Sequence, residues 1–250
     1  MKQFIKAIPN FHWGFRFLIF IGISIIGMLL TIIPALIIDL YKKNVMLSYV
    51  AIGIGILVYA LISSLLYRFW KNISIEYAKF KSEQKIIWSA RNMFYFISSL
   101  LIYLSYHLLI SHYLDHVDDN KVPNITWFII LIVFIFQAVF APIIEELITR
   151  GLFLSLFFRE DKEWNIMLST HLPLYPYMIR FIVAGIMSAF ISSTLHGAVS
   201  DMAMYGLVIN GLLCVWLYYK TKHIIIPIAL HMFNNNIVVI SMILFMFQQK

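Results

Sequence analysis

The chain alternates between long apolar stretches and short polar connections. A helix that crosses a bilayer needs roughly 20 apolar residues, and seven stretches without Asp, Glu, Lys or Arg reach about that length. They are Phe17–Ile38, Asn44–Tyr67, Asn92–Leu114, Val122–Ile144, Phe181–Ser200, Met202–Tyr219 and Ile224–Gln249. The apolar residues run continuously instead of alternating with polar ones, which predicts helices and excludes a membrane β-barrel. The pattern predicts an all-α, polytopic transmembrane helix bundle.

The fourth stretch leaves the number of spans open. It continues past Glu145, Glu146 and Arg150 into a second apolar run, Gly151–Phe158. Pro142 lies just before the acidic pair, and a proline inside a helix removes a backbone hydrogen bond and can break the helix. A continuous fourth helix gives seven spans, whereas a break at Pro142 gives eight.

The composition excludes a water-soluble domain. Of the 250 residues, 62% are hydrophobic and only 12% are charged, whereas soluble domains carry about 25% charged residues. The single cysteine, Cys214, excludes an internal disulfide and a cysteine-rich zinc site. The net charge of +7 does not indicate a nucleic-acid partner, because no binding motif accompanies it and basic residues gather in the cytoplasmic loops of membrane proteins.

Basic residues predict the orientation of the chain in the membrane. Six of them lie in or beside the connection Phe69–Ile87, namely Arg68, Lys71, Lys79, Lys81, Lys85 and Arg91. With seven spans and the N-terminus inside, thirteen Lys and Arg residues face the cytoplasm and four face outward. The positive-inside rule therefore predicts a multi-pass cell-membrane protein with a cytoplasmic N-terminus. The first span would be a retained signal anchor.

We divide the chain at the start of the fourth stretch. Residues 1–121 form a three-span N-terminal region with the basic cytoplasmic loop, and residues 122–250 form the core that carries the candidate site.

Two of the twelve acidic residues, Glu145 and Glu146, lie inside a predicted span. Ionisable residues at such depth are costly and usually mark function. Arg150 follows Glu146 by four residues, so the two share a helix face and are predicted to pair. Glu145 is rotated about 100° away and needs a partner from another helix. His196 and His231 are the candidates, and Asn235 shares the helix face of His231.

These residues resemble the motifs of the CAAX protease and bacteriocin-processing family (CPBP, also called Abi) of intramembrane proteases. The family pattern is Glu-Glu-x-x-x-Arg, then Phe-x-x-x-His, then His-x-x-x-Asn. Glu145-Glu146-x-x-x-Arg150 and His231-x-x-x-Asn235 match fully. The middle motif matches at His196 only, because Ser192 occupies the Phe position and the nearest phenylalanine is Phe190. The resemblance covers the chain from about Trp127 to its end.

The resemblance implies a glutamic intramembrane protease with its active site within the bilayer. Glu145 would act as the general base that activates a water molecule, and His196 would hold the same water. His231 and Asn235 would stabilise the oxyanion, while Glu146 and Arg150 would support the site from behind. No cofactor is required by this chemistry.

Zinc is the competing account, since the family was once labelled as metalloproteases. Glu145, His196 and His231 would then be the ligands. The depths of the two histidines in the membrane differ in the seven-span arrangement. His196 lies nearer the outer end of its helix, and His231 lies nearer the inner end of its own. The two can share a water only if helices are tilted, broken or of unequal length.

The expected partners are the lipid bilayer and a peptide or membrane-protein substrate, such as a hydrophobic leader, a pheromone or a membrane-protein tail. The sequence does not indicate an oligomeric state. A non-catalytic membrane protein in bacteriocin self-immunity or sensor-kinase regulation is the main alternative, and the absent motif Phe favours it. A transporter or proton relay is the third reading, because intramembrane acids suit that class, although no paired half-repeats are present.

Overall fold

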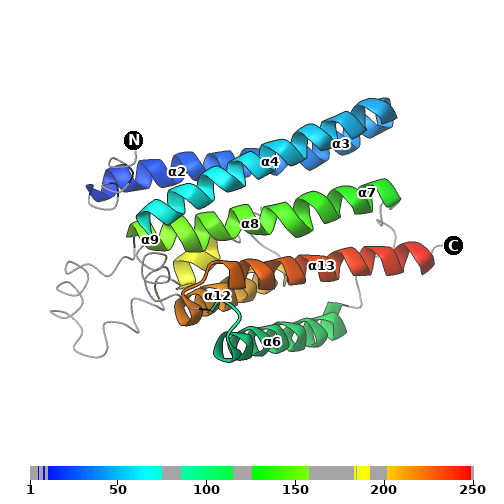
Figure 1. Ribbon diagram of the computed structural model, residues 1–250. Coiled ribbons are helices and arrows are strands. Elements are labelled where there is room, and N and C mark those ends of the chain that lie inside the picture. The colour runs from blue at the N-terminus through cyan, green and yellow to red at the C-terminus, as the bar shows by residue number, and fades with distance from the viewer. Residues whose placement is uncertain are drawn as a thin grey trace.

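The computed structural model describes residues 11–74, 86–114, 126–157, 185–191 and 202–248, together with residues 5, 8 and 183. All regular secondary structure in this part of the chain is helical, which confirms the predicted all-α class (Figure 1). The helices are α2 (Trp13–Leu30), α3 (Ile32–Lys43), α4 (Val45–Ile73), α6 (Ala90–Leu114), α7 (Trp127–Ile132), η3 (Val133–Phe140), α8 (Ala141–Glu146), η4 (Leu147–Leu152), α9 (Phe153–Phe157), α12 (Met202–Thr221) and α13 (Ile225–Gln248).

Four helical stretches among the described residues are long and apolar enough to cross a membrane. They are Trp13–Lys43, Val45–Ile73, Trp127–Phe157 and Ile225–Phe247, and they coincide with the first, second, fourth and seventh predicted spans. The third and sixth predicted spans coincide with α6 and α12, helices of 25 and 20 residues. The fifth lies mostly outside the described residues, which contain the short helix 185–191 from it.

The predicted alternative of a break at Pro142 is wrong, because α7, η3, α8, η4 and α9 follow one another without interruption from Trp127 to Phe157. The backbone passes the proline by widening into a π-helix, in which the N–H of Ala141 bonds to the carbonyl of Phe136, five residues earlier. In the same pattern the next N–H would bond to Gln137, but Pro142 has none. The side-chain amide of Asn235 on α13 donates to that carbonyl instead, at 2.8 Å.

The first span is interrupted where the sequence predicts an unbroken helix. Helix α2 ends at Leu30 and α3 begins at Ile32. Pro34 lacks the N–H that would bond to the Leu30 carbonyl, and the Tyr59 hydroxyl of α4 donates to that carbonyl at 2.7 Å. Both proline sites thus receive a hydrogen-bond donor from a neighbouring helix, as an apolar environment requires.

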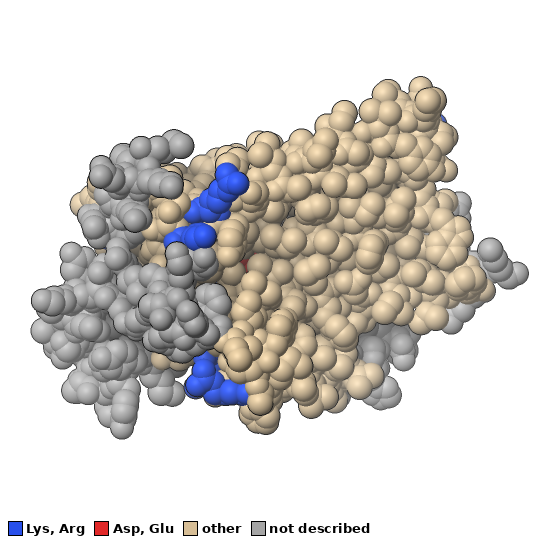
Figure 2. Space-filling view, viewed as in Figure 1, with Lys and Arg blue, Asp and Glu red and all other residues tan. Residues whose placement is uncertain are grey.

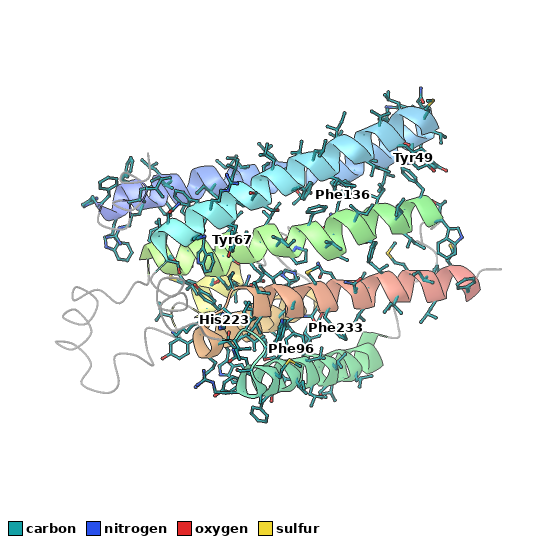
Figure 3. All side chains as sticks on the ribbon, in the orientation of Figure 1. Tyr49, Tyr67, Phe96, Phe136, His223 and Phe233 are labelled. Carbon is teal, nitrogen blue, oxygen red and sulfur yellow. The ribbon has the colours of Figure 1, made fainter. Side chains whose placement is uncertain are left out.

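The stretch from α7 to α9 lies in the middle of the bundle. Figure 1 shows α2, α3 and α4 along one side of it and α13, α12 and α6 along the other. Phe136, which is labelled in Figure 3, lies between the middle helix and α4 and packs against Tyr59 with ring centroids 5.2 Å apart. The middle helix contributes most of the fully buried side chains, including Ile132, Leu147, Ile148, Arg150, Leu152 and Leu156. The N-terminal helices therefore cover the part of the chain that carries the acidic pair.

Large apolar side chains cover much of the outside of the bundle. Among the most exposed are Leu18 and Leu57 on the N-terminal helices and Phe94 and Leu108 on α6. A soluble protein rarely exposes so much contiguous apolar surface, so this surface suits lipid.

Basic residues gather at the end of the bundle where the N-terminus lies. Helices α4 and α12 end there, and the Trp70 indole of α4 donates to the Tyr218 hydroxyl of α12 at 3.3 Å. The basic side chains at this end are Arg68, Lys71, Arg91, Lys220 and Lys222, and Figure 2 shows such a group on one face. The C-terminus lies at the opposite end (Figure 1). A cytoplasmic N-terminus remains a prediction from this distribution.

Candidate functional site

Glu146 and Arg150 form the ion pair that their spacing predicts. Arg150 Nη1 lies 3.1 Å from Glu146 Oε1, and both side chains are completely buried. Arg150 also donates to the hydroxyl of Thr149. A charged group removed from water needs an opposite charge and hydrogen bonds. Glu146 supplies the opposite charge to Arg150, and Thr149 on the same helix accepts a hydrogen bond from it.

Room for the arginine comes from a glycine on α12. A Cβ on Gly211 would lie 3.1 Å from Nη2 of Arg150 and 2.8 Å from the Cα and Cβ of Ala189. The absence of a side chain at Gly211 therefore lets α12 approach both the guanidinium and the helix 185–191.

His231 lies between the two glutamates. Its Nδ1 is 2.9 Å from Glu146 Oε1, and its Nε2 is 3.7 Å from Glu145 Oε2. The two nitrogens lie on opposite edges of the ring, so one histidine reaches two carboxylates that point in different directions from α8. His231 is one of the two partners that the sequence predicts for Glu145.

The proton position on His231 follows from its partner. Arg150 pairs with Glu146 as a carboxylate, which can only accept hydrogen bonds. Nδ1 therefore carries the proton and donates to Glu146. This bond orients the imidazole, as the hydrogen bond to the second ring nitrogen commonly does at functional histidines. Nε2 remains the ring atom that faces Glu145.

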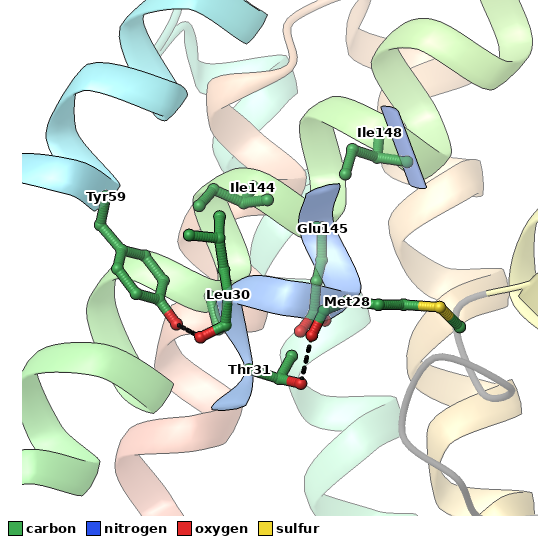
Figure 4. Close-up of a pocket in the computed structure, with 9 residues that line it drawn as sticks. Met28, Leu30, Thr31, Tyr59, Ile144, Glu145 and Ile148 are labelled. Atoms are coloured by element: carbon green, nitrogen blue, oxygen red, sulfur yellow. Dashed lines mark hydrogen bonds between the residues drawn. The ribbon is translucent and has the colours of Figure 1, made fainter. Parts of the chain in front are cut away.

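Glu145 differs from Glu146 in its access to the outside. Its side chain is 12% exposed, against 0% for Glu146. It lines a small cleft whose other walls are Gly27, Met28, Leu30, Thr31, Tyr59, Ala141, Ile144 and Ile148 (Figure 4). Thr149 lies one turn further along, where its hydroxyl donates to the Glu145 carbonyl at 2.6 Å. A water molecule can thus reach Glu145, while Glu146 stays enclosed.

Two π-helical segments flank the acidic pair. Helix α8 lies between η3 and η4, and in η4 the N–H of Phe153 bonds to the Ile148 carbonyl, again five residues back. π-Helical segments are rare in proteins, and those that occur often lie at functional sites. The sequence does not reveal them, although Pro142 signals that the hydrogen-bond ladder must change nearby.

Asn235 lies on the same face of α13 as His231, as predicted, and is partly buried. Its side-chain amide donates a hydrogen bond to the Gln137 carbonyl. The asparagine of the third motif therefore connects α13 to η3 at the level of the site.

A second polar group lies between α12 and α13 and was missed by sequence reasoning. The buried side chain of Asn234 donates to Asn210 Oδ1, and the thiol of Cys214 lies 3.7 Å from the same oxygen. Asn234 follows His231 by three residues, so its position on the same face was the available signal. The same thiol lies 3.8 Å from the carbonyl oxygen of Pro227 on α13.

His196 and Ser192 lie outside the described residues, so the middle motif has no structural description. The short helix 185–191 that precedes them packs on the site region. The Ser188 hydroxyl donates to the Thr149 carbonyl at 2.8 Å. Phe190, the phenylalanine nearest to the motif position, is more than half exposed.

Among the described residues, no group of three His, Cys, Asp or Glu side chains has metal-binding geometry. Glu145 and His231 would supply two ligands. Glu146 would hold the other ring nitrogen of His231, as a carboxylate often does for a metal-bound histidine. The third predicted ligand, His196, is not described, so zinc remains an alternative.

Comparison with known proteins gives one family. Residues 125–237 match the family described as Type II CAAX prenyl endopeptidase Rce1-like. This segment contains both glutamates, Arg150, both candidate histidines and Asn235. No curated protein and no solved structure gives a significant match.

Proposed function

We propose, from the premise that this membrane protein belongs to the CAAX protease (CPBP) family through residues 125–237, that it is an intramembrane endopeptidase of the glutamic type. The observation that carries the proposal is the position of His231, which lies 3.7 Å from Glu145 and is oriented by Glu146. One partly accessible carboxylate beside a fixed imidazole is an arrangement suited to activating water.

Glu145 would act first as base and then as acid. A water molecule beside its carboxylate gives up a proton to Glu145 while the water oxygen bonds to the peptide carbonyl carbon. The carbonyl oxygen becomes an oxyanion. The carbon–nitrogen bond then breaks, Glu145 passes its proton to the leaving nitrogen, and the products are a carboxylic acid and an amine. The predicted role of His196 is to hold the same water.

His231 and Asn235 would stabilise the oxyanion. With Nδ1 bonded to Glu146, Nε2 is the ring atom directed at the reaction, and when protonated it donates to the developing charge. The Asn235 amide carries two hydrogens, one of which Gln137 accepts, so the other can serve the oxyanion. Glu146 and Arg150 position the imidazole and do not touch the substrate.

The proposed substrates are hydrophobic leader peptides, pheromones or membrane-protein tails. The cleft beside Glu145 is almost entirely apolar in its lining, which suits segments of that kind. The peptide chemistry needs no cofactor.

The test compares purified wild-type protein with Glu145→Gln in detergent, against a pool of hydrophobic leader peptides, with and without a chelator. We expect cleavage that Glu145→Gln abolishes and that chelation leaves intact. Asp39→Asn is the matched control, because Asp39 is an exposed acid paired with Lys43 at 2.6 Å on α3, away from the site. Loss on chelation with recovery on adding zinc would replace the water-activating role of Glu145 by metal ligation.

A non-catalytic role in bacteriocin self-immunity or sensor-kinase regulation is the second candidate, and Ser192 in place of the motif Phe favours it. In that case Glu145→Gln would leave the phenotype unchanged in cells that depend on the protein. Retention of processing by His196→Ala at normal expression would count against the proteolytic mechanism.

A further inference from the structure

An open groove lies at the end of the bundle where basic residues gather, between the start of α6 and the turn from α12 to α13. Its walls are Ile86, Ser89, Arg91, Asn92 and His223. The groove measures about 330 Å³, a volume within the range of small-molecule sites, about 300 to 1,000 Å³. Figure 3 shows His223 close to the start of α6. Because His223 precedes His231 by eight residues, the groove lies about 12 Å along the helix axis from the candidate reaction centre.

Asn92 gives the groove an unused hydrogen-bond acceptor. Its side chain is only 2% exposed, and its Nδ2 donates to the Ile87 carbonyl at 2.8 Å. Its Oδ1 has no hydrogen-bond partner among the described residues. A buried acceptor without a donor is destabilising. Oδ1 is therefore the atom of this amide that is left for a donor on a bound molecule.

The other polar groups of the groove suit an anion. Arg91 is exposed in its wall, and α6 begins at Ala90. The first N–H groups of a helix lack acceptors within the helix, and they attract negative charge. Lys220 and Lys222 lie nearby at the end of α12, where Lys222 Nζ is 4.3 Å from the Tyr219 ring centroid.

Negative charge is scarce at this end of the bundle. The acidic side chains among the described residues are Asp39, Glu145 and Glu146. Asp39 lies on α3 at the opposite end, and the two glutamates lie inside the bundle. The neighbouring connection 75–85 carries three lysines and two glutamates in its sequence, so it also adds positive charge.

Exposed aromatic side chains place the groove at the surface of the bilayer. Trp88, next to Ser89, is 45% exposed, and Tyr219 is 41% exposed. Trp and Tyr side chains gather where the hydrocarbon meets the lipid headgroups. Phe94 and Leu101 follow on α6 as exposed apolar residues. A molecule with a polar group in the groove can thus lay its hydrocarbon chains along α6.

We propose that this groove binds the headgroup of an anionic phospholipid that carries a headgroup hydroxyl, as phosphatidylglycerol does. The phosphate pairs with Arg91 at the N-terminus of α6, and the headgroup hydroxyl donates to Asn92 Oδ1. The acyl chains lie against Phe94 and Leu101. The bound lipid connects α6 to the turn before α13, the helix that carries His231. This inference does not depend on the proposed proteolytic function.

The experiment compares two lipids of equal charge. Phosphatidylglycerol and phosphatidylethanol each carry a single negative phosphodiester, but only phosphatidylglycerol has hydroxyl groups in its headgroup. Each lipid is titrated into the delipidated full-length protein in detergent, and native mass spectrometry gives the Kd. We expect the wild-type protein to bind phosphatidylglycerol about two- to tenfold more tightly, the effect of one hydrogen bond.

Two variants separate the hydroxyl from the phosphate. Asn92→Ala should bind both lipids with equal affinity, because the acceptor for the hydroxyl is gone. Arg91→Gln should weaken the binding of both lipids about fivefold, the usual effect of one basic residue near a membrane surface, and should keep the preference. Arg91 is exposed, so this variant tests the site even if Asn92→Ala fails to fold. Lys42→Gln is the matched control, because it removes an exposed positive charge from α3 at the opposite end of the bundle.

A preference for phosphatidylglycerol that Asn92→Ala removes and Lys42→Gln keeps supports the site. Equal binding of the two lipids by the wild-type protein, with equal losses in Arg91→Gln and Lys42→Gln, would show diffuse charge attraction and overturn it. A preference that persists in Asn92→Ala would place the lipid elsewhere. Displacement of bound phosphatidylglycerol by an equal concentration of glycerol 1-phosphate would show a site for soluble phosphates and overturn the assignment to a lipid.

Discussion

Nδ1 of His231 lies 2.9 Å from Oε1 of Glu146, and this contact determines which ring nitrogen is directed at Glu145. The bond joins α13 to α8 across 85 residues of sequence. Arg150, one turn after Glu146 on the same helix, holds the same carboxylate oxygen. The orientation of the imidazole therefore depends on a buried ion pair that does not itself face the cleft.

Glu146→Gln should lower kcat about 10- to 100-fold, the usual effect of removing the partner that orients a functional histidine. The change also leaves Arg150 as a buried charge without its carboxylate, which costs about 3–5 kcal/mol of stability. Thermal unfolding in detergent and peptide cleavage measure the two effects.

The double variant Glu146→Gln/Arg150→Met separates these effects. It removes both charges, so most of the lost unfolding free energy should return while the activity stays low. Recovery of activity together with stability would show that Glu146 only serves the fold.

Asn235→Ala should destabilise the protein by about 1–3 kcal/mol, because the Gln137 carbonyl loses its donor in an apolar environment. Adding Pro142→Ala restores a backbone N–H that can bond to Gln137 within the helix. The double variant should therefore regain stability in thermal unfolding.

Cleavage by that double variant then reports whether Asn235 also serves the reaction. If the asparagine stabilises the oxyanion, activity stays low while stability returns. Parallel recovery of both would assign Asn235 to the fold alone.

Tyr59→Phe should destabilise the protein by about 1–3 kcal/mol, because the Leu30 carbonyl keeps no donor where Pro34 lacks an N–H. Tyr49→Phe is the control on the same helix, since the Tyr49 side chain is more than half exposed. Equal unfolding temperatures for the two variants would contradict the role given to the Tyr59 hydroxyl.

Gly211→Ala should destabilise the protein by about 1–3 kcal/mol, as overpacking in a close-packed region does. The added Cβ would meet backbone at Ala189, 2.8 Å away, and the Arg150 guanidinium at 3.1 Å. Gly53→Ala on α4 meets nothing within 4 Å and should leave the unfolding temperature unchanged or slightly raised, because alanine favours helix more than glycine does. A Gly211→Ala protein as stable and as active as Gly53→Ala would show that α12 can move away freely.

The length of the apolar stretches and their lack of charged residues were enough to predict an all-α chain. A helix pairs its backbone N–H and C=O groups with one another, which is necessary where no water is present. The Glu146–Arg150 pair was predictable for the same reason, since four residues separate its members on one helix. The rule that proline interrupts a helix was less informative about where the helices end. It applies equally to Pro34 and Pro142, yet the helix breaks near the first and continues as a π-helix past the second.

What the sequence determined by itself is therefore the helices, the membrane environment and the set of polar residues that needed partners. The tertiary structure alone decided that His231 bridges both glutamates, that Asn235 and Tyr59 serve carbonyls freed by prolines, and that the first span reaches Glu145. Helix formation and pairing at four-residue spacing are local and follow from neighbouring residues. Contacts between helices depend on which faces pack together and at what depth, and these follow only from the packing of the whole bundle.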